Sequence, residues 1–238
     1  MNVVFIFINT YFLYMSNINF SLSNRNRKVA INRWSKVNSL KKAFIEVTSK
    51  NKLSYSILLG FLAGDGSVQK RKIKSGYRYQ IDFFPDDRYM LDIFLYCFYD
   101  LYSCYPSVKK KVNFYSVRVS SNVIGEYLLN KCNLGTKDWD ILEDINHVLW
   151  LKAFFSCEAY VSKYIRLQTI NGYGMKKISN LLFKFSIDHK FYTYKPKNGN
   201  SLVYIIVIIR KKALKLFYTK IGFFHDKKTL KLKEALYL

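Results

Sequence analysis

The feature that most constrains the fold is an order of secondary-structure patterns that occurs twice, beginning near residue 50. In the first copy, helical periodicity over 55–63 stops at Gly64-Asp65-Gly66 and an alternating strand follows over 77–84. In the second copy, a helical segment over 147–157 reaches Glu158 and alternation follows over 164–170. The two acids are 93 residues apart (158 − 65), and Tyr115 and Tyr204 are 89 apart (204 − 115). We therefore predict a tandem duplication.

The remaining patterns complete each copy. The first copy continues with helices over 87–102 and 123–133 around a strand pair near 108–119, and the second with helices over 175–185 and 213–221 around strands over 190–194 and 202–209. We predict an α+β fold with pseudo-twofold symmetry, made of two αββαββα units that each form an antiparallel four-stranded sheet. The expected parts are an N-terminal arm over 1–49, a first half over 50–145 and a second half over 146–238. Repeats of this size also build structural arrays, so the duplication alone does not indicate a function.

Composition narrows the function. Lys and Arg number 39 against 16 Asp and Glu, which gives a net charge of +23, while half of the residues are hydrophobic. Disorder requires low hydrophobicity together with high charge, so this chain is predicted to bury a core. The commonest partner for such an excess of positive charge is DNA or RNA. An anionic membrane surface is the weaker alternative.

The first 49 residues differ from the rest of the chain. An apolar run of about a dozen residues, VVFIFINTYFLYM, is shorter than the roughly 20 residues that span a bilayer, so we expect no stable membrane association. No acid precedes Glu46, and basic residues accumulate among serines and asparagines. Two interpretations fit this composition equally well: an organellar targeting segment, or a basic arm that includes translated upstream sequence. We leave residues 1–38 out of the fold prediction.

Cysteine and histidine spacing excludes two classes of site. The four cysteines form no CxxC pair and the three histidines are far apart in sequence, so we predict neither a zinc site nor a disulfide framework. Abundant Lys, Asn, Ile, Tyr and Phe indicate an A+T-rich gene. That composition favours a mitochondrial genome, and equally suits a virus or a compact microbial genome, with the protein then in the cytoplasm.

The segment that carries chemistry is the apolar helix that ends in an acid. Residues 58–66 read LLGFLAGDG, and the second copy over 151–159 reads LKAFFSCEA. This pair resembles the LAGLIDADG homing endonucleases, in the monomeric form that contains two copies of the motif as an internal pseudo-dimer. The first copy matches at Leu58, Gly60, Asp65 and Gly66, and the second is degenerate. Together with the repeated element order, the resemblance covers roughly residues 50–236.

The resemblance implies a metal-dependent nuclease site. In this family the two motif helices pack side by side, which implies that Gly60 and Ala153 lie at the helix interface. The acids at the helix ends, here Asp65 and Glu158, bind divalent ions, normally Mg²⁺, with help from backbone carbonyls that would be those of Gly64 and Cys157. Hydrolysis of a phosphodiester needs an activated water and a stabilised leaving oxygen, which ions held by hard carboxylate oxygens supply.

Basic residues are expected to complete this site. Lys137 stands 72 residues after Asp65 (137 − 65) and Lys228 stands 70 residues after Glu158 (228 − 158), each after the last predicted helix of its half. The similar offsets match a lysine pair that approaches the phosphate or the attacking water in the family. A solvated surface charge is the other interpretation of each lysine.

The alternating strands are expected to recognise DNA. The first strand has an apolar face and a polar face of Arg78, Gln80 and Asp82, and the second has Tyr164, Arg166 and Gln168. Arg and Gln suit bidentate major-groove contacts with guanine and adenine. Basic residues at strand ends and turns would hold phosphates; they are Lys70, Arg71, Lys72, Lys109, Lys110, Lys111, Arg118, Lys163, Lys195 and Lys197. The alternative is an ordinary solvated sheet face with charged turns.

The resulting hypothesis is a site-specific, divalent-metal-dependent endonuclease that cuts double-stranded DNA at a long asymmetric target, and the resemblance implies that an intron encodes it. Three departures from the family motif argue for reduced cleavage: Ala159 replaces the final glycine, Ser156 and Cys157 precede the second acid, and Pro85 stands where a polar residue is common. The alternatives are a non-cleaving maturase that binds intron RNA, a degenerate DNA-binding relative, and a peripheral membrane protein.

Overall fold

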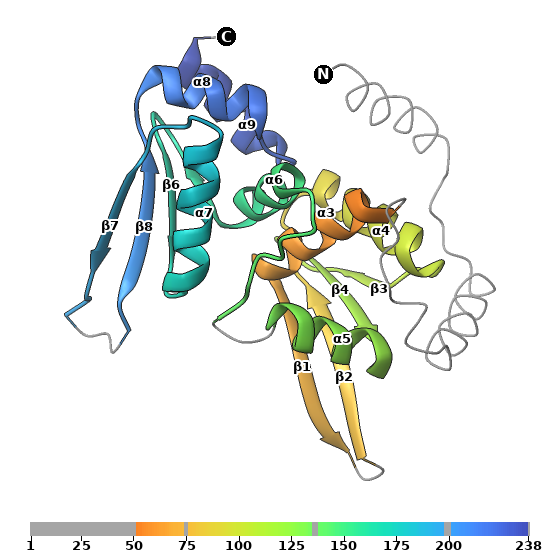
Figure 1. Ribbon diagram of the computed structural model, residues 1–238. Coiled ribbons are helices and arrows are strands. Elements are labelled where there is room, and N and C mark those ends of the chain that lie inside the picture. Colours follow the sequence, from red (N-terminus) through yellow and green to blue (C-terminus); the bar gives the residue numbers. More distant parts are fainter. Residues whose placement is uncertain (1–50, 74–75, 135–137, 198–200, 238) are drawn as a thin grey trace, which may run out of the picture.

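The computed structural model describes residues 51–73, 76–134, 138–197 and 201–237 (Figure 1). The N-terminal arm and Lys137 therefore lie outside the described residues. The first half contains, in order, α3 (Lys52–Ala63), β1 (Gly66–Ile73), β2 (Gly76–Phe83), α4 (Arg88–Tyr102), β3 (Ser107–Lys110), β4 (Tyr115–Ser120) and α5 (Asn122–Cys132). Its four strands form one antiparallel sheet in the order β1-β2-β4-β3.

The second half repeats this order. It contains α6 (His147–Glu158), β5 (Tyr160–Val161), β6 (Ile165–Thr169), α7 (Gly172–Lys184), β7 (Lys190–Tyr194), β8 (Val203–Ile208), α8 (Lys211–Lys220) and α9 (Asp226–Leu236). Its strands form a second antiparallel sheet in the order β5-β6-β8-β7, which matches the first sheet position by position. The predicted α+β duplication with two four-stranded sheets is confirmed.

The strand ranges predicted from the sequence include neither β1 nor β5, the first strand of each sheet. The structure gives β1 eight residues and β5 only two. The helix α9 follows α8, although we predicted that Lys228 lies in a basic stretch after the last helix. Charged residues dominate α9 and obscure its periodicity, but Leu232 and Leu236 are buried one turn apart, which is the spacing of a helix that packs on one side.

Equivalent caps begin the helices that follow the second strand of each half. The carboxylate of Asp87 accepts hydrogen bonds from the backbone N–H groups of Tyr89 and Met90 at the start of α4. The side chain of Asn171 accepts a bond of 2.8 Å from the Gly174 N–H at the start of α7. Such caps satisfy N–H groups that have no partner inside the helix, so the turn from strand to helix is fixed at the same place in both halves.

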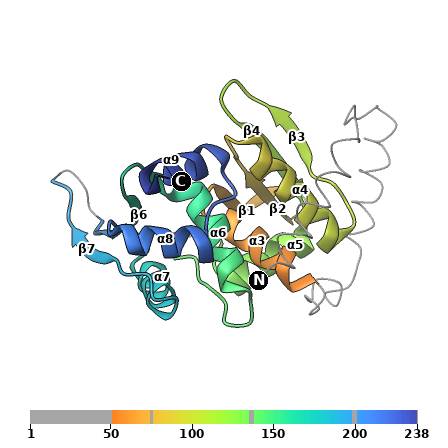
Figure 2. The same cartoon turned by 90° about the horizontal axis from the view of Figure 1, so that it is seen from above.

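The helices α3 and α6 pack against each other at the centre of the molecule (Figures 1 and 2). Gly60 permits this contact: a Cβ atom built at this position would lie 2.4 Å from the Trp150 carbonyl oxygen and 2.8 Å from the Ala153 Cβ. A hydrogen atom is the only side chain that fits between the two backbones. The structure therefore places Gly60 and Ala153 against each other across the helix pair.

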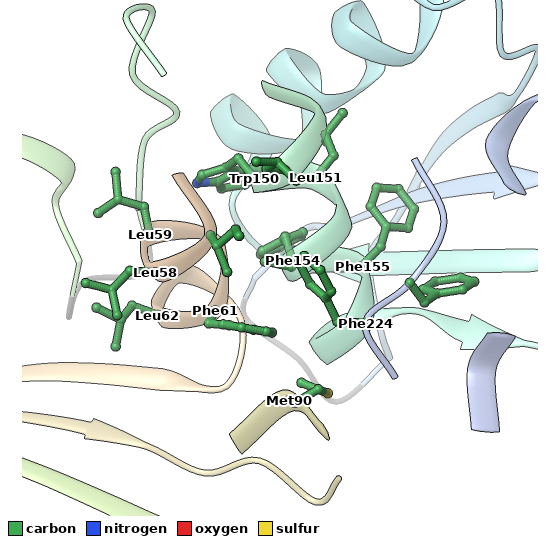
Figure 3. Close-up of a cluster of buried hydrophobic side chains, with 14 of the residues drawn as sticks. Leu58, Leu59, Phe61, Leu62, Met90, Trp150, Leu151, Phe154, Phe155 and Phe224 are labelled. Atoms are coloured by element: carbon green, nitrogen blue, oxygen red, sulfur yellow. The ribbon is translucent and has the colours of Figure 1, made fainter. Parts of the chain in front are cut away.

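Aromatic and aliphatic side chains fill the space around this helix pair. Figure 3 shows side chains from both helices in one buried cluster, with Phe224 of the second half among them. The Phe61 ring of α3 lies 5.7 Å from that of Phe224, measured between centroids, and Trp150 stacks on Phe154 at 4.9 Å. The core is thus continuous between the two halves, which fixes the ends of α3 and α6 relative to each other.

Buried serines join these helices to the chain around them in the same way in both halves. The Ser56 hydroxyl donates to the Lys52 carbonyl and accepts the Asn146 N–H at 2.8 Å, which holds the start of α6 against α3. The Ser156 hydroxyl donates to the Lys152 carbonyl and accepts the Phe224 N–H at 2.7 Å. The second of these bonds brings the segment before α9 to the end of α6, close to Glu158.

Each sheet has one face covered by helices. On the covered face of the first sheet, Val68, Ile81 and Val117 are buried, and α5 packs so closely that its Gly125 contacts the Tyr79 side chain. The β1–β2 and β7–β8 hairpins extend to the same side of the central helix pair (Figure 1). Within the described segments, no helix is long and apolar enough to cross a membrane.

Candidate active site

The ends of the two central helices bring the two acids together. Asp65 follows the Gly64 that ends α3, and Glu158 is the last residue of α6. A Cβ atom built on Gly64 would lie 2.5 Å from the Cys157 Cβ and 3.6 Å from the Glu158 Cγ, so the helix ends touch at this point. The Cys157 thiol lies 4.0 Å from the Phe61 carbonyl oxygen across the same contact. One acid from each half therefore stands at the junction of the halves.

The surroundings disfavour the charged form of both acids. Burial raises the pKa of Asp65, while the positive charge of Lys228 and a hydrogen bond from Cys157 act in the opposite direction. The pKa of Glu158 is also raised, first by desolvation from the packed atoms beside its carboxyl and then by the negative charge of Asp65. The Glu158 residue as a whole is nevertheless exposed, so a ligand can reach it. A bound cation would relieve the repulsion between the two carboxylates.

Lys228 reaches this site from the first turn of α9. Its ammonium group donates hydrogen bonds of 2.7 Å to the carbonyl oxygens of both Ser156 and Cys157, which are left without helical partners at the end of α6. Burial lowers the pKa of Lys228, and the nearby acids, among them Asp65 and Glu158, act against this effect. The structure thus places the predicted lysine of the second half next to both acids.

The residues present fit a divalent cation that takes oxygen ligands. Among the residues that the structure describes, no group of three His, Cys, Asp or Glu side chains could hold a metal. Mg²⁺ commonly binds through one or two carboxylates, water and substrate phosphates, so Asp65 and Glu158 suffice on the protein side. The expected role of the Cys157 carbonyl is altered, because in this structure that oxygen accepts a hydrogen bond from Lys228.

His225 belongs to this site although the sequence did not indicate it. It is buried, with its Nε2 3.4 Å from an oxygen of Asp86 and its Nδ1 3.6 Å from an oxygen of Asp87, both in the turn between β2 and α4. Interaction with His225 lowers the pKa of Asp86. Because Phe224 and Lys228 flank His225, the segment from Phe224 to Lys228 joins the second half to the first beside the acid pair. A lone histidine in a basic stretch gave only a weak signal for this role.

Two of the predicted DNA-contacting residues are not where the sequence suggested. Gln80 and Asp82 are buried, at 6% and 2% exposure, whereas we expected both to face base edges. The Gln80 amide donates to Asp82, whose carboxylate also pairs with Arg118 at 2.7 Å. Both residues lie on β2, between β1 and β4, and side chains of the sheet supply their hydrogen-bonding partners. The alternating pattern of a single strand does not show such partners. Arg78 and Arg71 remain exposed, directly opposite each other on β2 and β1.

The basic run from Lys70 to Lys72 is divided between the two faces of the sheet. Lys70 and Lys72 lie opposite Tyr79 and Tyr77 on the side away from Arg71, and the Lys70 ammonium lies 4.4 Å from the centre of the Tyr77 ring. The other basic residues predicted to hold phosphates are exposed, namely Lys109, Lys110, Lys111, Arg118, Lys163, Lys195 and Lys197. Arg166 is partly buried and donates to the exposed Gln168 at 3.1 Å.

We expect Lys228→Met to lower the cleavage rate about 10- to 100-fold, the usual cost of losing a partner that supports a metal site. The substitution removes a positive charge that lowers the pKa of both Asp65 and Glu158. Both pKa values should therefore rise, and the pH below which cleavage fails should rise with them. The check is a pH profile of the cleavage rate. The control is Lys227→Met, which removes an equal charge from an exposed neighbour; an unshifted profile in Lys228→Met would contradict the assignment.

The raised pKa of Asp65 also predicts an effect on stability. A carboxyl with a higher pKa in the folded than in the unfolded state binds protons more tightly when folded, so the free energy of unfolding falls as pH rises through both values. We expect Asp65→Asn to raise Tm at pH 7, where the wild-type carboxyl is ionised against this burial cost, and we expect the gain to disappear in acid. Calorimetry at pH 7 and pH 3 tests this against the exposed-site control Glu143→Gln. A Tm of Asp65→Asn below that of the wild type at pH 7 would contradict the conclusion that burial disfavours the ionised Asp65 carboxyl.

Comparison with known proteins identifies the fold. Residues 146–222 match a family model described as a LAGLIDADG-like domain. The chain is 30% identical over 214 residues to a DNA polymerase of Thermococcus kodakarensis, and 28% identical over 179 residues to one of Thermococcus aggregans. These matches include 79% and 72% of this chain, which spans only 12% and 10% of the polymerases.

Solved structures that resemble the chain include homing endonucleases. Variants of I-DmoI superpose with a TM-score of 0.56 at 18% identity, covering 72% of this chain and 96% of that chain. I-DmoI in complex with DNA and Mn has a TM-score of 0.55 at 19% identity, and the match covers 72% of this chain and 97% of that one. I-WcaI bound to its DNA recognition sequence has a TM-score of 0.50 at 16% identity, and the match covers 80% of this chain and 91% of that one. The chain thus has the two-sheet fold of the LAGLIDADG homing endonucleases, and its residues 146–222 are a LAGLIDADG-like domain.

Proposed function

We propose that this protein is a site-specific endonuclease that hydrolyses both strands of a DNA duplex with the help of a divalent cation. The observation that carries the proposal is the contact between the ends of α3 and α6, which brings Asp65 and Glu158 to one place beside Lys228. Two carboxylates whose pKa values are raised need a positive partner when ionised. The chain as a whole carries a net charge of +23, which suits a DNA substrate.

The chain's own residues then have distinct roles. Asp65 and Glu158 would hold the cation, which when bound supplies Lewis-acid stabilisation of the charge that develops on the phosphate and its leaving oxygen. Lys228 holds the end of α6 through two carbonyl oxygens and places a positive charge beside both acids. His225 ties the turn that carries Asp86 to the same place. The two sheets, one on each half, would hold the duplex across this site.

The polymerase matches support a mobile element as the origin of the chain. Since the chain corresponds to about a tenth of each polymerase, we infer that the matched segments are LAGLIDADG domains inserted into the polymerase sequences. An enzyme that cuts a long DNA target suits such an element, because a double-strand break allows the element to be copied into the cut site. The same proposal includes three further points: an intron encodes this chain, the chain acts as a monomer, and the ion is Mg²⁺.

The test is a cleavage selection with the purified chain. A plasmid library of long random duplex targets is incubated with Mg²⁺ or Mn²⁺, and the ends of linear products are sequenced. The proposal predicts one preferred site with ends at fixed positions, and no linear product when EDTA is present. Specific binding without cutting in either metal would support the non-cleaving relative instead. A chain that neither binds nor cuts any duplex would overturn the proposal.

A further inference from the structure

The helices that follow the second and the fourth strand differ in charge between the two halves. In the first half these helices are α4 and α5, whose charged residues are Arg88 and Lys131 against Asp92, Asp100 and Glu126. In the second half they are α7 and α8, which contain no Asp or Glu. The charged residues of α7 and α8 are all lysines, namely Lys176, Lys177, Lys184, Lys211, Lys212, Lys215 and Lys220. The duplicated fold does not require this difference, because α4 and α5 occupy the same positions without it.

Both helices lie away from the uncovered face of the second sheet. The ring of Tyr204 on β8 lies against α7, because a Cβ atom built on Gly172 would be 2.3 Å from that ring. The helix α8 follows β8 directly, so it begins at the end of this strand opposite the β7–β8 hairpin (Figure 1). A duplex held on the uncovered sheet faces would therefore leave the exposed side of both helices accessible. We call this side, formed by the exposed residues of α7 and α8, the outer helical face.

The exposed side of α7 combines aromatic rings with positive charge. Its members recur at intervals of three or four positions, which places them on one face of the helix; they are Tyr173, Lys176, Asn180, Phe183 and Lys184. Phe183 is 80% exposed, so its ring contributes little to the core. An aromatic ring held at the surface among basic residues is the usual platform on which proteins stack unpaired bases.

Most of the lysines on the outer helical face are available to a ligand. Lys177 pairs with Asp140 at 2.6 Å, and Lys220 donates to the Phe185 carbonyl at 2.9 Å, which joins the end of α8 to the end of α7. The other lysines of the two helices are exposed and form no ion pair within the part of the chain that the structure describes. They are Lys176, Lys184, Lys211, Lys212 and Lys215.

Charge restricts what can cover this face. A second copy of the chain carries a net charge of +23, and residues 1–49 contain Glu46 as their only acid, so neither complements a row of lysines. The partner is therefore a different polyanion. An anionic bilayer is a poor match, since Tyr173 and Phe183 stand about 15 Å apart along the helix, with polar residues between them, whereas a helix on a membrane surface presents a continuous apolar face.

The aromatic ring distinguishes between the remaining polyanions. Duplex DNA offers phosphates but keeps its bases stacked inside the helix, so Phe183 would have no base to stack on. A folded RNA presents unpaired bases in loops and bulges next to its phosphates, and proteins recognise such bases by stacking aromatic side chains on them. Exposed lysines around Phe183 therefore favour RNA over a second duplex.

We propose that the outer helical face binds a folded RNA, with its lysines on the phosphates and Phe183 stacked on an unpaired base. This is a second binding activity that goes beyond the proposed endonuclease, because it uses neither the acid pair nor the uncovered sheet faces. RNA and duplex DNA would then be bound at the same time, on opposite sides of the second sheet.

The experiment measures RNA binding while duplex DNA occupies the sheets. The full chain is titrated in EDTA, by fluorescence anisotropy, into a labelled RNA hairpin whose loop has about ten unpaired adenosines, in the presence of excess unlabelled duplex DNA. We expect the hairpin to bind under these conditions. A fully paired RNA of the same length should bind at least about fivefold more weakly, because it offers no base for stacking.

Two variants link this binding to the outer helical face. Phe183→Ser should lose about fivefold to 100-fold in affinity for the looped RNA, the usual range for one stacked base, and should bind the duplex as the wild type does. Lys184→Gln should reduce the slope of log affinity against log salt concentration by about 0.7, the value for one phosphate contact of a single strand. The control is Lys131→Gln, which removes one charge from the last turn of α5 and should leave both quantities unchanged.

Several results would overturn the inference and leave the endonuclease intact. They are displacement of the looped RNA by duplex DNA, equal affinity for the looped and the fully paired RNA, and looped-RNA binding that Phe183→Ser leaves unchanged. Failure of both RNAs to bind beside the duplex would overturn it as well, and would leave an acidic protein as the partner. The assay contains no metal and requires no cleavage, so a chain that cuts no DNA would contradict the proposed function without changing these outcomes.

Discussion

Asp65→Asn should reduce DNA cleavage at least about 1,000-fold, while DNA affinity stays the same or increases slightly. The carboxylate is required to hold the cation, and stabilisation of transition-state charge by a metal is worth several kcal/mol, of which each 1.4 kcal/mol is tenfold in rate. Affinity should not fall, because the substitution removes a negative charge beside the DNA phosphates. Single-turnover cleavage and anisotropy on one target measure both quantities.

Glu158→Gln should behave in the same way, because it removes the acid of the other half from the same junction. The exposed-site variant Glu143→Gln removes a charge of the same sign from elsewhere on the surface and should cleave at the wild-type rate. A Glu158→Gln protein that cuts at the wild-type rate would show that the degenerate second motif takes no part in catalysis. Loss of DNA binding along with cleavage would indicate damage to the fold.

Gly60→Ala should destabilise the protein by about 1–3 kcal/mol, the cost of overpacking a well-packed core. Helix propensity alone predicts the opposite, a gain of up to about 1 kcal/mol. The new Cβ atom would lie 2.4 Å from the Trp150 carbonyl oxygen, and backbone in the middle of a packed helix has no room to move away. Because α3 and α6 would be pushed apart, the cleavage rate should also fall. Urea unfolding and the cleavage assay on the same preparation test both effects.

The double variant Gly60→Ala with Ala153→Gly separates the two contacts at this position. It removes the close approach to the Ala153 Cβ, at 2.8 Å, but keeps the closer approach to the Trp150 carbonyl. We expect the double variant to lose less free energy of unfolding than the sum of the losses measured for Gly60→Ala and Ala153→Gly alone. A Gly60→Ala protein as stable as the wild type would show that the two helices do not pack as closely as described.

The sequence predicted the features that depend on local pattern and on the duplication. Helical periodicity that ends in an acid located Asp65 and Glu158 in the two halves, and the repeated order of patterns predicted two sheets of four strands. The helix α9 was missed because its buried residues, Leu232 and Leu236, stand among many lysines. A helix held by a few contacts with the rest of the fold leaves only a weak periodic signal.

Features that depend on contacts between distant segments could not be predicted. Asp82 is buried because it pairs with Arg118, which lies 36 residues later on β4. The alternating pattern of β2 does not show which strand lies beside it or which residue of that strand faces Asp82. The position of His225 depends on Phe224 entering the core against Phe61 of the other half. In both cases the side chain is polar and would be predicted as exposed from its type, whereas its partner across the fold makes burial possible.

The most direct test of the central claim compares the wild type with the double variant Asp65→Asn, Glu158→Gln on one selected target, as the Mg²⁺ concentration is raised. The wild type should cut both strands with a rate that rises with Mg²⁺ and vanishes in EDTA. The double variant should bind the same duplex at least as tightly and cut neither strand at any Mg²⁺ concentration. Metal-dependent cutting at the same positions by the double variant would contradict the assignment of the active site to the junction of the two helices.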